Sequence, residues 1–281
     1  MTTHPAIAKD RVAVITGGAS GIGLAAAKIF AAKGMKVMIA DRPGVALQAA
    51  ERAVIEHAPS GSAAIRAVAT DVAKGDEVLA LKIAAYDAFG SVDVLMNNAG
   101  VGIVGKALDP SPAWHELLGV NLWGVINGVQ AFAHAMMAQG TPGLIINTGS
   151  KQGITTPPGN TAYNVSKAGV RVFTESTAHE LRSVPGCRVS AHLLIPGFTF
   201  TGMTGQDEKP AAAWSGEQVV DFMLEALGRG DFYILCPDND VDRATDEKRM
   251  AWAMGDIIDN RPALSRWHPD YAEAFQTYMG G

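Results

Sequence analysis

The fold is decided by residues Arg11 to Gly34, which read RVAVITGGASGIGLAAAKIFAAKG. A short β-branched run precedes a glycine cluster and an alanine-rich segment, the order of strand, turn and helix in a phosphate-binding unit. Gly17, Gly21 and Gly23 permit a tight turn and close backbone approach, and the start of the following helix offers free N–H groups to an anion. The spacing G-x-x-x-G-x-G departs from the usual dinucleotide fingerprint, so a plain turn remains an alternative.

A second strand, KVMIAD, ends at Asp41, which lies 20 residues after Gly21. In a Rossmann-type fold an acidic group at this distance accepts hydrogen bonds from the adenosine ribose hydroxyls, and its charge repels a 2′-phosphate. The position therefore predicts NAD as the cofactor in preference to NADP. Arg42 leaves NADP open because a guanidinium could receive that phosphate, and a solvated strand end is the third interpretation.

Further elements alternate along the chain. We expect strands at 64–69, 92–100, 188–194 and 232–235, another over the apolar run at 144–146 before Ser150, and helices at 43–59, 75–89, 111–138, 161–182, 216–227 and 241–260. Strands that alternate with helices of about 12 to 18 residues indicate parallel β-α-β units. The sequence thus predicts an α/β, doubly wound, seven-stranded parallel sheet in a single domain over residues 1–281. Its core spans about 8–236, and 237–281 forms a C-terminal extension.

Composition excludes several partners and sites. The net charge is −5, which gives no basic field for nucleic acid or an anionic membrane surface. Cys187 and Cys236 lack metal-ligand spacing, so we expect two buried free thiols, no metal site and a reducing cytoplasmic location. The N-terminus has no apolar core like that of a signal peptide, and no apolar run approaches about 18 residues.

A second informative stretch runs from Asn147 to Lys167 and holds Ser150 at a strand end and Tyr163 and Lys167 at i and i+4. On a helix beginning near Thr161, the phenol and the ammonium would lie one turn apart. A nearby positive charge favours the phenolate and so suits the tyrosine to acid/base work. Ser150 could donate to the same reacting oxygen. An ordinary helix-surface pair is the alternative interpretation.

Polar residues recur where the predicted strands end, which is where ligands bind in open parallel sheets. They are Gly17 to Gly23, Asp41, Asp71, Asn97 to Gly100 and Ser150. Asn121, in the middle of a helical pattern, is either a solvent-facing residue or the site of a bend or a bound water beside Lys167.

With these residues laid out, the chain resembles a classical short-chain dehydrogenase/reductase over roughly residues 8–236. The matching motifs are TGGASGIG at Thr16 to Gly23, Asp71-Val72, NNAG at Asn97 to Gly100, Asn121, Ser150, YNVSK at Tyr163 to Lys167, and Pro196-Gly197 with Thr201. Their order and spacing are those of the family. The resemblance implies an NAD(P)-dependent oxidoreductase that transfers a hydride between nicotinamide and a secondary alcohol or ketone.

The resemblance also implies residue roles. Tyr163 would be the acid/base, Lys167 would lower its pKa and bind the nicotinamide ribose, Ser150 would hydrogen-bond the substrate oxygen, and Asn121 would hold a water in a proton relay. Cofactor contacts would come from Gly17, Ser20, Gly21, Ile22, Gly23, Asp41, Arg42, Asp71, Val72, Asn98, Ala99, Gly100, Tyr163, Lys167, Pro196, Gly197, Thr199 and Thr201. The family is commonly tetrameric through the helices that hold Asn121 and Tyr163, so a homo-oligomer is expected.

The substrate is expected to contact Ser150, Gln152, Tyr163 and Phe198, with walls from 101–104, 152–156 and 198–214. Residues 198–214 combine glycines at 202 and 205 with large apolar side chains, which predicts a lid; alternatively, these side chains pack against the C-terminal helix or a neighbouring subunit. Lys151 should point away. Few charges face the cavity, so a medium-sized apolar, cyclic or aromatic substrate is expected over a sugar or a phosphorylated one.

Two other functions stay open at this point. A dinucleotide-binding regulatory module would not need the set of Ser150, Tyr163, Lys167 and Asn121. An NAD-dependent epimerase or dehydratase would need a further acid/base beside Tyr163, and the sequence shows none.

Overall fold

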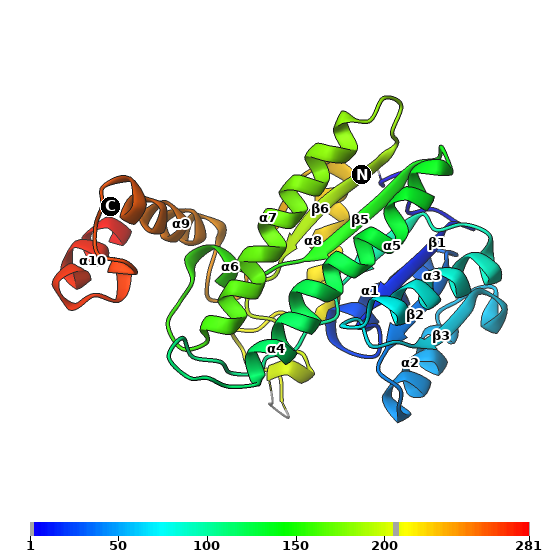
Figure 1. Cartoon of the computed structure of the whole chain (residues 1–281), viewed down its shortest axis with the longest axis horizontal. Coiled ribbons are helices and arrows are strands. Elements are labelled where there is room, and N and C mark those ends of the chain that lie inside the picture. The colour runs from blue at the N-terminus through cyan, green and yellow to red at the C-terminus, as the bar shows by residue number, and fades with distance from the viewer. Residues whose placement is uncertain (1–2, 205–207, 281) are drawn as a thin grey trace.

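The computed structural model describes residues 3–204 and 208–280, and its centre is one parallel sheet (Figure 1). The strand order is β3-β2-β1-β4-β5-β6-β7, and every pairing is parallel. The strands are β1 (Val12–Thr16), β2 (Lys36–Asp41), β3 (Ile65–Ala69), β4 (Val94–Asn97), β5 (Gly143–Thr148), β6 (Val189–Ile195) and β7 (Tyr233–Leu235). The predicted doubly wound seven-stranded fold is confirmed.

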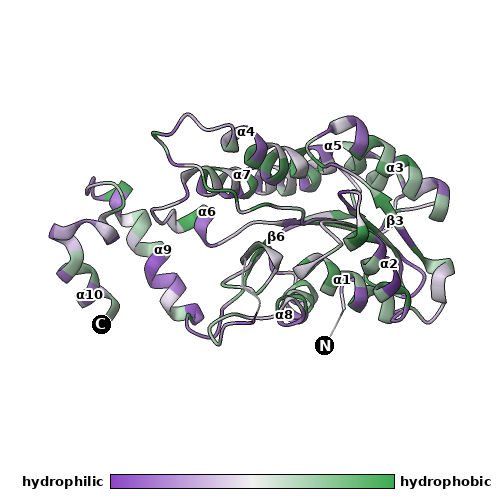
Figure 2. Cartoon of the chain, turned by 90° about the horizontal axis from the view of Figure 1, so that it is seen from below, coloured by the Kyte–Doolittle hydropathy of each residue, from purple (hydrophilic) through white to green (hydrophobic). Residues whose placement is uncertain are grey.

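Helices cover both faces of the sheet (Figure 2). One face carries α1 (Gly21–Ala32), α2 (Val45–Ile55) and α8 (Gly216–Arg229), and the other carries α3 (Gly75–Phe89), α5 (Gly124–Ala138) and α7 (Thr161–Ser183). Neighbouring strand residues point to opposite faces, so Ile15 packs with Phe30 of α1 while Val14 belongs to the core that contains Phe132 of α5. The double cover explains why the strands read as continuous apolar runs.

The segment expected as one helix over 111–138 is interrupted. It consists of α4 (Ala113–Leu118), a π-helical turn (Gly119–Trp123) and α5. A Cβ atom at Gly124 would lie 2.7 Å from Val72 Cγ2, and one at Gly128 would lie 2.0 Å from Asn97 Oδ1. Close packing against Val72 and Asn97 therefore fixes the rotation of α5.

Several predicted boundaries were too generous. The helix expected at 43–59 is Val45–Ile55, the strand expected at 92–100 is Val94–Asn97, and the one at 232–235 begins at Tyr233. Pro43 cannot donate to a helix, and the residues after Asn97 leave the sheet to line the site described below. Of the two free thiols, Cys236 is buried, which raises its pKa to about 12, whereas Cys187 is only half-buried in the turn before β6.

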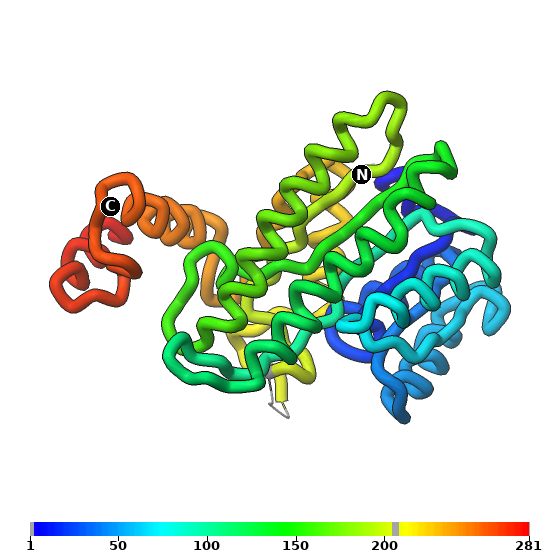
Figure 3. Tube along the Cα trace, viewed as in Figure 1, coloured from blue at the N-terminus to red at the C-terminus, as the bar shows by residue number. Residues whose placement is uncertain are grey.

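The C-terminal segment lies at one end of the molecule, away from the centre of the sheet (Figures 1 and 3). It contains α9 (Arg243–Ile258) and α10 (Ala272–Gly280). Its own small core pairs Trp252 with Phe275 at 5.3 Å between ring centroids, and the Arg261 guanidinium lies 4.2 Å from the Trp252 ring centroid. Trp252 Nε1 donates to Ser265 Oγ. In the part of the chain that the structure describes, no helix has the length and apolarity required to cross a bilayer.

Candidate active site

A cavity of about 930 Å³ runs along the carboxyl ends of the strands. It is lined by most of the predicted site residues, which come from segments far apart in sequence. These are Gly17, Ser20, Gly21, Ile22, Asp41, Arg42, Asp71, Val72, Asn98, Ala99, Gly100, Ser150, Gln152, Tyr163, Lys167, Pro196, Gly197, Phe198, Thr199 and Thr201. Gly23 and Asn121 do not line it and act behind its wall.

The glycine-rich turn is packed backbone to backbone against the segment after β4. Gly17 has φ +66°, and a Cβ atom there would lie 2.7 Å from Ala99 Cα. A Cβ at Gly23 would lie 2.2 Å from the Gly17 carbonyl oxygen. Any side chain at either position would push the turn open, so these glycines do more than terminate a strand. Helix α1 begins at Gly21 beside the cavity, where its free N–H groups suit an anion.

The end of β2 presents an oriented carboxylate. Asp41 Oδ2 accepts a hydrogen bond from the Ala19 N–H at 3.0 Å, and Oδ1 accepts one from the Arg42 N–H at 2.8 Å. The two bonds fix the carboxylate plane at the cavity wall. The Arg42 side chain is exposed. Asp41 is therefore the oriented group of this pair.

Three strands are tied together beneath the cavity by Thr16 and Asn98. The N–H groups of Asn98 and Ala99 donate to Thr16 Oγ1 at 3.0 and 3.2 Å. Asn98 Nδ2 donates to the carbonyl oxygens of Thr16 and Gly17, and Thr148 Oγ1 donates to Asn98 Oδ1. The bonds hold the ends of β1, β4 and β5 in one register. This role of Thr16 is not visible in the sequence, because its hydrogen-bond partners lie 80 or more residues away.

Ser150, Tyr163 and Lys167 meet at one point on the cavity wall. Tyr163 and Ser150 share a side-chain hydrogen bond. Lys167 is buried, its Nζ donates to the Thr148 carbonyl oxygen at 2.8 Å, and it lies 5.8 Å from the Tyr163 ring centroid. The expected one-turn spacing on α7 is present, and the interpretation as an ordinary surface pair is wrong.

Burial sets the pKa values of this group. It lowers the pKa of Lys167 to about 8. It raises the pKa of Tyr163 above its usual value, and the hydrogen bond with Ser150 opposes that rise. The sequence predicted that the ammonium lowers the tyrosine pKa; in this structure desolvation of the phenol is the larger influence. Burial therefore favours the neutral form of both groups, and the hydrogen bond with Ser150 counteracts this for Tyr163.

Asn121 is fully buried in the π-helical turn, so the solvent-facing interpretation is wrong. Its side chain closes a ring with the backbone of Val101: the Val101 N–H donates to Asn121 Oδ1 at 2.7 Å, and Nδ2 donates to the Val101 carbonyl at 3.0 Å. Nδ2 also lies 3.4 Å from Ser166 Oγ on α7. Asn121 thus connects the cavity wall to the helix that carries Tyr163.

The expected lid divides into two parts. Phe198 and Met203 line the cavity, but Trp214 does not. Trp214 packs edge to face on Phe222 of α8 at 5.9 Å, and its backbone exchanges hydrogen bonds with Phe198 and Phe200. For Trp214 the lid prediction is wrong, because its ring adds to the core between α1 and α8. Gly205, one expected hinge, lies outside the described residues.

Several lining residues were not predicted individually. Thr70, Thr148 and Gly149 belong to strand ends that were recognised only by their neighbours. Asn160 was missed although an asparagine before a helix is a typical N-cap signal. It caps α7 by accepting from the Tyr163 N–H, and its Nδ2 donates to the Ile103 carbonyl.

Comparison with known proteins gives consistent matches. Residues 11–212 match the family described as short chain dehydrogenase. The chain is 33% identical over 267 residues to the 1-deoxy-11-beta-hydroxypentalenate dehydrogenase of Streptomyces exfoliatus, covering 92% of this chain and 94% of that one. It is 30% identical over 253 residues to the NADP-dependent (R)-specific alcohol dehydrogenase of Lentilactobacillus kefiri, covering 89% and 96%.

Among solved structures, the crystal structure of a short chain dehydrogenase/reductase from Burkholderia phymatum in complex with NAD matches with a TM-score of 0.81 at 32% identity. That match covers 92% of this chain and 96% of the other. Motifs, sheet order and site geometry agree with these similarities, and the chain belongs to the short-chain dehydrogenase/reductase family.

Proposed function

We propose that the protein is an NAD-dependent oxidoreductase that interconverts a secondary alcohol and a ketone. One observation carries this proposal: Tyr163 is hydrogen-bonded to Ser150 beside the buried Lys167, in the same cavity as the glycine-rich turn and Asp41. Bound NAD would supply the redox chemistry by accepting or giving a hydride at its nicotinamide ring.

The cavity fits a dinucleotide. Close packing at Gly17 and Gly23 holds the turn closed, so that the start of α1 faces the cavity where a pyrophosphate would bind. The Asp41 carboxylate, fixed by two backbone N–H groups, would receive the ribose hydroxyls and would oppose a 2′-phosphate because it cannot turn away. The Lentilactobacillus relative is NADP-dependent by name and the Burkholderia structure holds NAD, so the preference for NAD rests on Asp41.

Tyr163 moves the proton in the proposed reaction. In alcohol oxidation the Tyr163 phenolate would take the hydroxyl proton, and in ketone reduction its phenol would return a proton to the oxygen, with bound NAD as the hydride acceptor or donor. Ser150 would donate a hydrogen bond to that oxygen and stabilise the developing charge. Lys167, anchored at the Thr148 carbonyl, would stabilise the phenolate and would hold the ribose hydroxyls of bound NAD.

Asn121 supports the relay of that proton to solvent. Its side chain is engaged by Val101, and a π-helical turn interrupts the regular i to i+4 bonding of the helix. Interruptions of this kind give a water access to main-chain carbonyl groups. We assign to Asn121 the holding of such a water beside Lys167.

The proposed substrate is a medium-sized apolar alcohol or ketone, cyclic or aromatic. Val101, Ile103, Phe198 and Met203 form the wall at this end of the cavity, with Gln152 as an additional polar group. The name of the Streptomyces relative identifies a hydroxypentalenate as its substrate, which supports oxidation of a hydroxyl group. A sugar would bring more hydroxyl groups than the few polar side chains of this wall can pair.

We further propose a homo-oligomer, dimeric or tetrameric, assembled through the helical layer of α5 and α7. Trp123, Val165 and Val172 are large apolar residues exposed on this layer. Contact with a second copy would remove them from water. Sedimentation equilibrium measures the assembly directly, and a monomer at micromolar concentration would contradict this part of the proposal.

The central test is NAD reduction by the purified protein across a panel of cyclic, aryl and linear secondary alcohols, with polyols as the comparison set. Turnover with cyclic or aryl alcohols is expected, and Tyr163→Phe serves as the inactive control. Tight NAD binding without turnover on any alcohol or ketone would favour a regulatory binding module. Copurification of NAD and hydration or epimerisation without net NADH formation would favour the epimerase or dehydratase alternative.

A further inference from the structure

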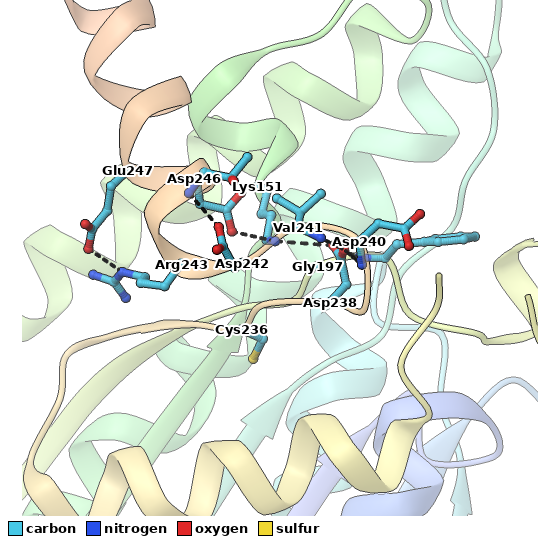
Figure 4. A network of polar contacts seen from close by, with 12 residues as sticks. Lys151, Gly197, Cys236, Asp238, Asp240, Val241, Asp242, Arg243, Asp246 and Glu247 are labelled. Carbon is cyan, nitrogen blue, oxygen red and sulfur yellow. Dashed lines mark hydrogen bonds and ion pairs between the residues drawn. The ribbon is translucent and has the colours of Figure 1, made fainter. Parts of the chain in front are cut away.

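Lys151 directly follows the proposed catalytic Ser150, and its ammonium lies between two carboxylates (Figure 4). Lys151 Nζ is 2.6 Å from Asp246 Oδ2 and 3.3 Å from Asp238 Oδ2. The side chains are 17%, 7% and 6% exposed, respectively. The sequence predicted that Lys151 points away from the cavity by strand alternation. Instead, Lys151 lies at the start of the short helix α6 (Gln152–Thr155) and is among the residues that line the cavity, while its ammonium pairs with the two carboxylates.

Asp238 connects this ion cluster to the substrate wall. Its Oδ2 accepts the N–H of Phe198 at 3.0 Å, and its Oδ1 accepts the N–H of Val241 at 2.8 Å just before α9. A Cβ atom at Gly197 would lie 2.7 Å from Asp238 Oδ2 and 3.0 Å from Lys151 Nζ. The cluster therefore lies directly against the backbone of Gly197 and Phe198, both of which line the cavity.

Asp246 connects the same cluster to the C-terminal segment. It lies in the first turn of α9 and is buried, and its burial raises its pKa while Lys151 opposes the rise. On the opposite side, α6 packs tightly on α7, since a Cβ at Gly153 would lie 2.5 Å from the Lys167 carbonyl carbon. The chain of contacts thus runs from α9 through Lys151 to both sides of the reacting centre.

One ammonium faces two carboxylates in this cluster, and Arg249 adds a further positive charge near Asp246. Removing such groups from water costs free energy that ion pairing only partly returns, and an apolar substitute of similar volume is often as stable. Stability alone is thus a poor explanation for three buried charges at this place. Their geometry, in which one lysine contacts the groups that fix Phe198 and α9, fits a role in setting the shape of the site.

We propose that Lys151, held by Asp238 and Asp246, is a positioning residue that makes α9 part of the substrate end of the active site. It sets the loop after Ser150 and, through Asp238, the backbone at Phe198. This inference rests on the proposed oxidoreductase function. Loss of the cluster should shift the wall at Phe198 and weaken alcohol binding, while the NAD contacts at Gly17 to Gly23 and Asp41 stay in place.

The test compares two carboxylates of α9. Asp246→Asn removes a charge from the Lys151 cluster, and Asp256→Asn is the matched control. Asp256 is similarly buried, 10% exposed, and pairs with Arg261 at 3.1 Å, but it contacts only the C-terminal segment. Lys151→Met is the second variant, which removes the cation and keeps much of the side-chain length.

We expect Asp246→Asn and Lys151→Met to raise the KM for the alcohol about 10-fold, with the Kd for NAD unchanged within about twofold. Asp256→Asn should lower Tm without changing KM. If the cluster only stabilised the fold, all three variants would have a lower Tm, and the folded variants would keep the wild-type KM. Wild-type turnover combined with unchanged KM in both cluster variants overturns the positioning role and leaves the proposed function intact.

Hydrogen exchange does not depend on activity, so it tests the positioning role of Lys151 separately from the oxidoreductase function. The Phe198 N–H is protected by Asp238, so hydrogen exchange in the peptide that contains Phe198 should accelerate about 10-fold in Lys151→Met and stay at the wild-type rate in Asp256→Asn. Faster exchange in a protein that turns over no alcohol would keep the positioning role and reject the oxidoreductase function. Unchanged exchange in Lys151→Met would reject the positioning role.

Discussion

The two ends of the cavity differ in construction: backbone forms the wall at one end, and side chains form it at the other. At the Asp41 end, backbone packs on backbone: Gly17 and Gly23 leave no space for a Cβ, and N–H groups fix the Asp41 carboxylate. At the Phe198 end, side chains from distant segments form the wall, and buried charges at Lys151 and Asp238 hold it. A surface made of backbone tolerates few sequences, whereas a surface made of side chains tolerates many. The first end suits a fixed ligand and the second a variable one.

The largest expected effect lies between the two ends. Tyr163→Phe removes the proton donor but keeps the ring, so kcat should fall about 10²-fold to 10⁴-fold, the range for one general acid/base. The Kd for NAD should stay within about twofold, since the proposed adenosine contacts lie elsewhere. Steady-state kinetics and a binding titration measure the two quantities. Activity within a few-fold of wild type would remove Tyr163 from the mechanism.

The second prediction concerns the buried charge of Lys167. The folded-state pKa of Lys167 is about 8, below its ordinary 10.5, so between these values the unfolded state binds more protons and wild-type stability rises with pH. Below pH 8 the buried charge costs on the order of 3 kcal/mol, partly offset by its bond to Thr148. Lys167→Met should therefore be the more stable protein at pH 7 while losing turnover.

Urea unfolding of both proteins at pH 7 and pH 9.5 measures this difference. The stability advantage of Lys167→Met should shrink at the higher pH, because the wild-type lysine is then neutral in the folded state. Other lysines titrate equally in both proteins and cancel in the comparison. An advantage that does not change with pH would mean that Lys167 is not desolvated as the structure has it.

The third prediction tests the cofactor preference at the Asp41 end of the cavity with the variant Asp41→Ala. Loss of the carboxylate removes the repulsion of a 2′-phosphate and leaves Arg42 beside it, so the ratio of kcat/KM for NADP over NAD should rise about 10-fold to 100-fold. Arg42→Ala is the counterpart and should leave the wild-type preference for NAD in place. A wild-type enzyme that already uses NADP as readily as NAD would contradict the proposed cofactor.

The smallest effect is expected at the substrate wall. Phe198→Ala should raise the KM for cyclic alcohols by a few-fold, because one apolar surface is lost from a wall with several. Trp214→Ala should leave KM nearly unchanged and instead destabilise the fold by about 3 kcal/mol, since its ring packs on Phe222. If instead Trp214→Ala raised KM and Phe198→Ala only destabilised the fold, Trp214 would belong to the lid, as the sequence predicted.

The sequence predicted the sheet because β-branched runs and glycine turns are local signals. Asp41, Ser150 and Tyr163 were found for the same reason: each follows a strand or opens a helix at a fixed distance from a recognisable pattern. The π-helical turn at Gly119–Trp123 was missed because the apolar periodicity of 111–138 is that of one helix, and the contacts of α5 with Asn97 and Val72 are remote in sequence. A helical periodicity does not record which face a remote strand will force inward.

Side-chain partners that are distant in the sequence could not be predicted either. Lys151 was expected only to point away, and nothing near it in sequence names Asp238 or Asp246 as its partners. Trp214 was assigned to the lid because a large apolar side chain in a loop looks the same whether it covers a ligand or a helix. Its partner Phe222 lies on an adjacent helix, and only the fold decides between the two.

The π-helical turn also marks where the length of this helical segment can vary. A π turn holds one residue more than an α turn, so deleting one residue within Gly119–Trp123 would close it into an ordinary α turn and leave α4 in nearly the same rotation relative to α5. Leu117 would then stay in the core, and the contact of Asn121 with Val101 would be the feature at risk. The same deletion inside α5 would rotate the residues before it by about 100° relative to those after it.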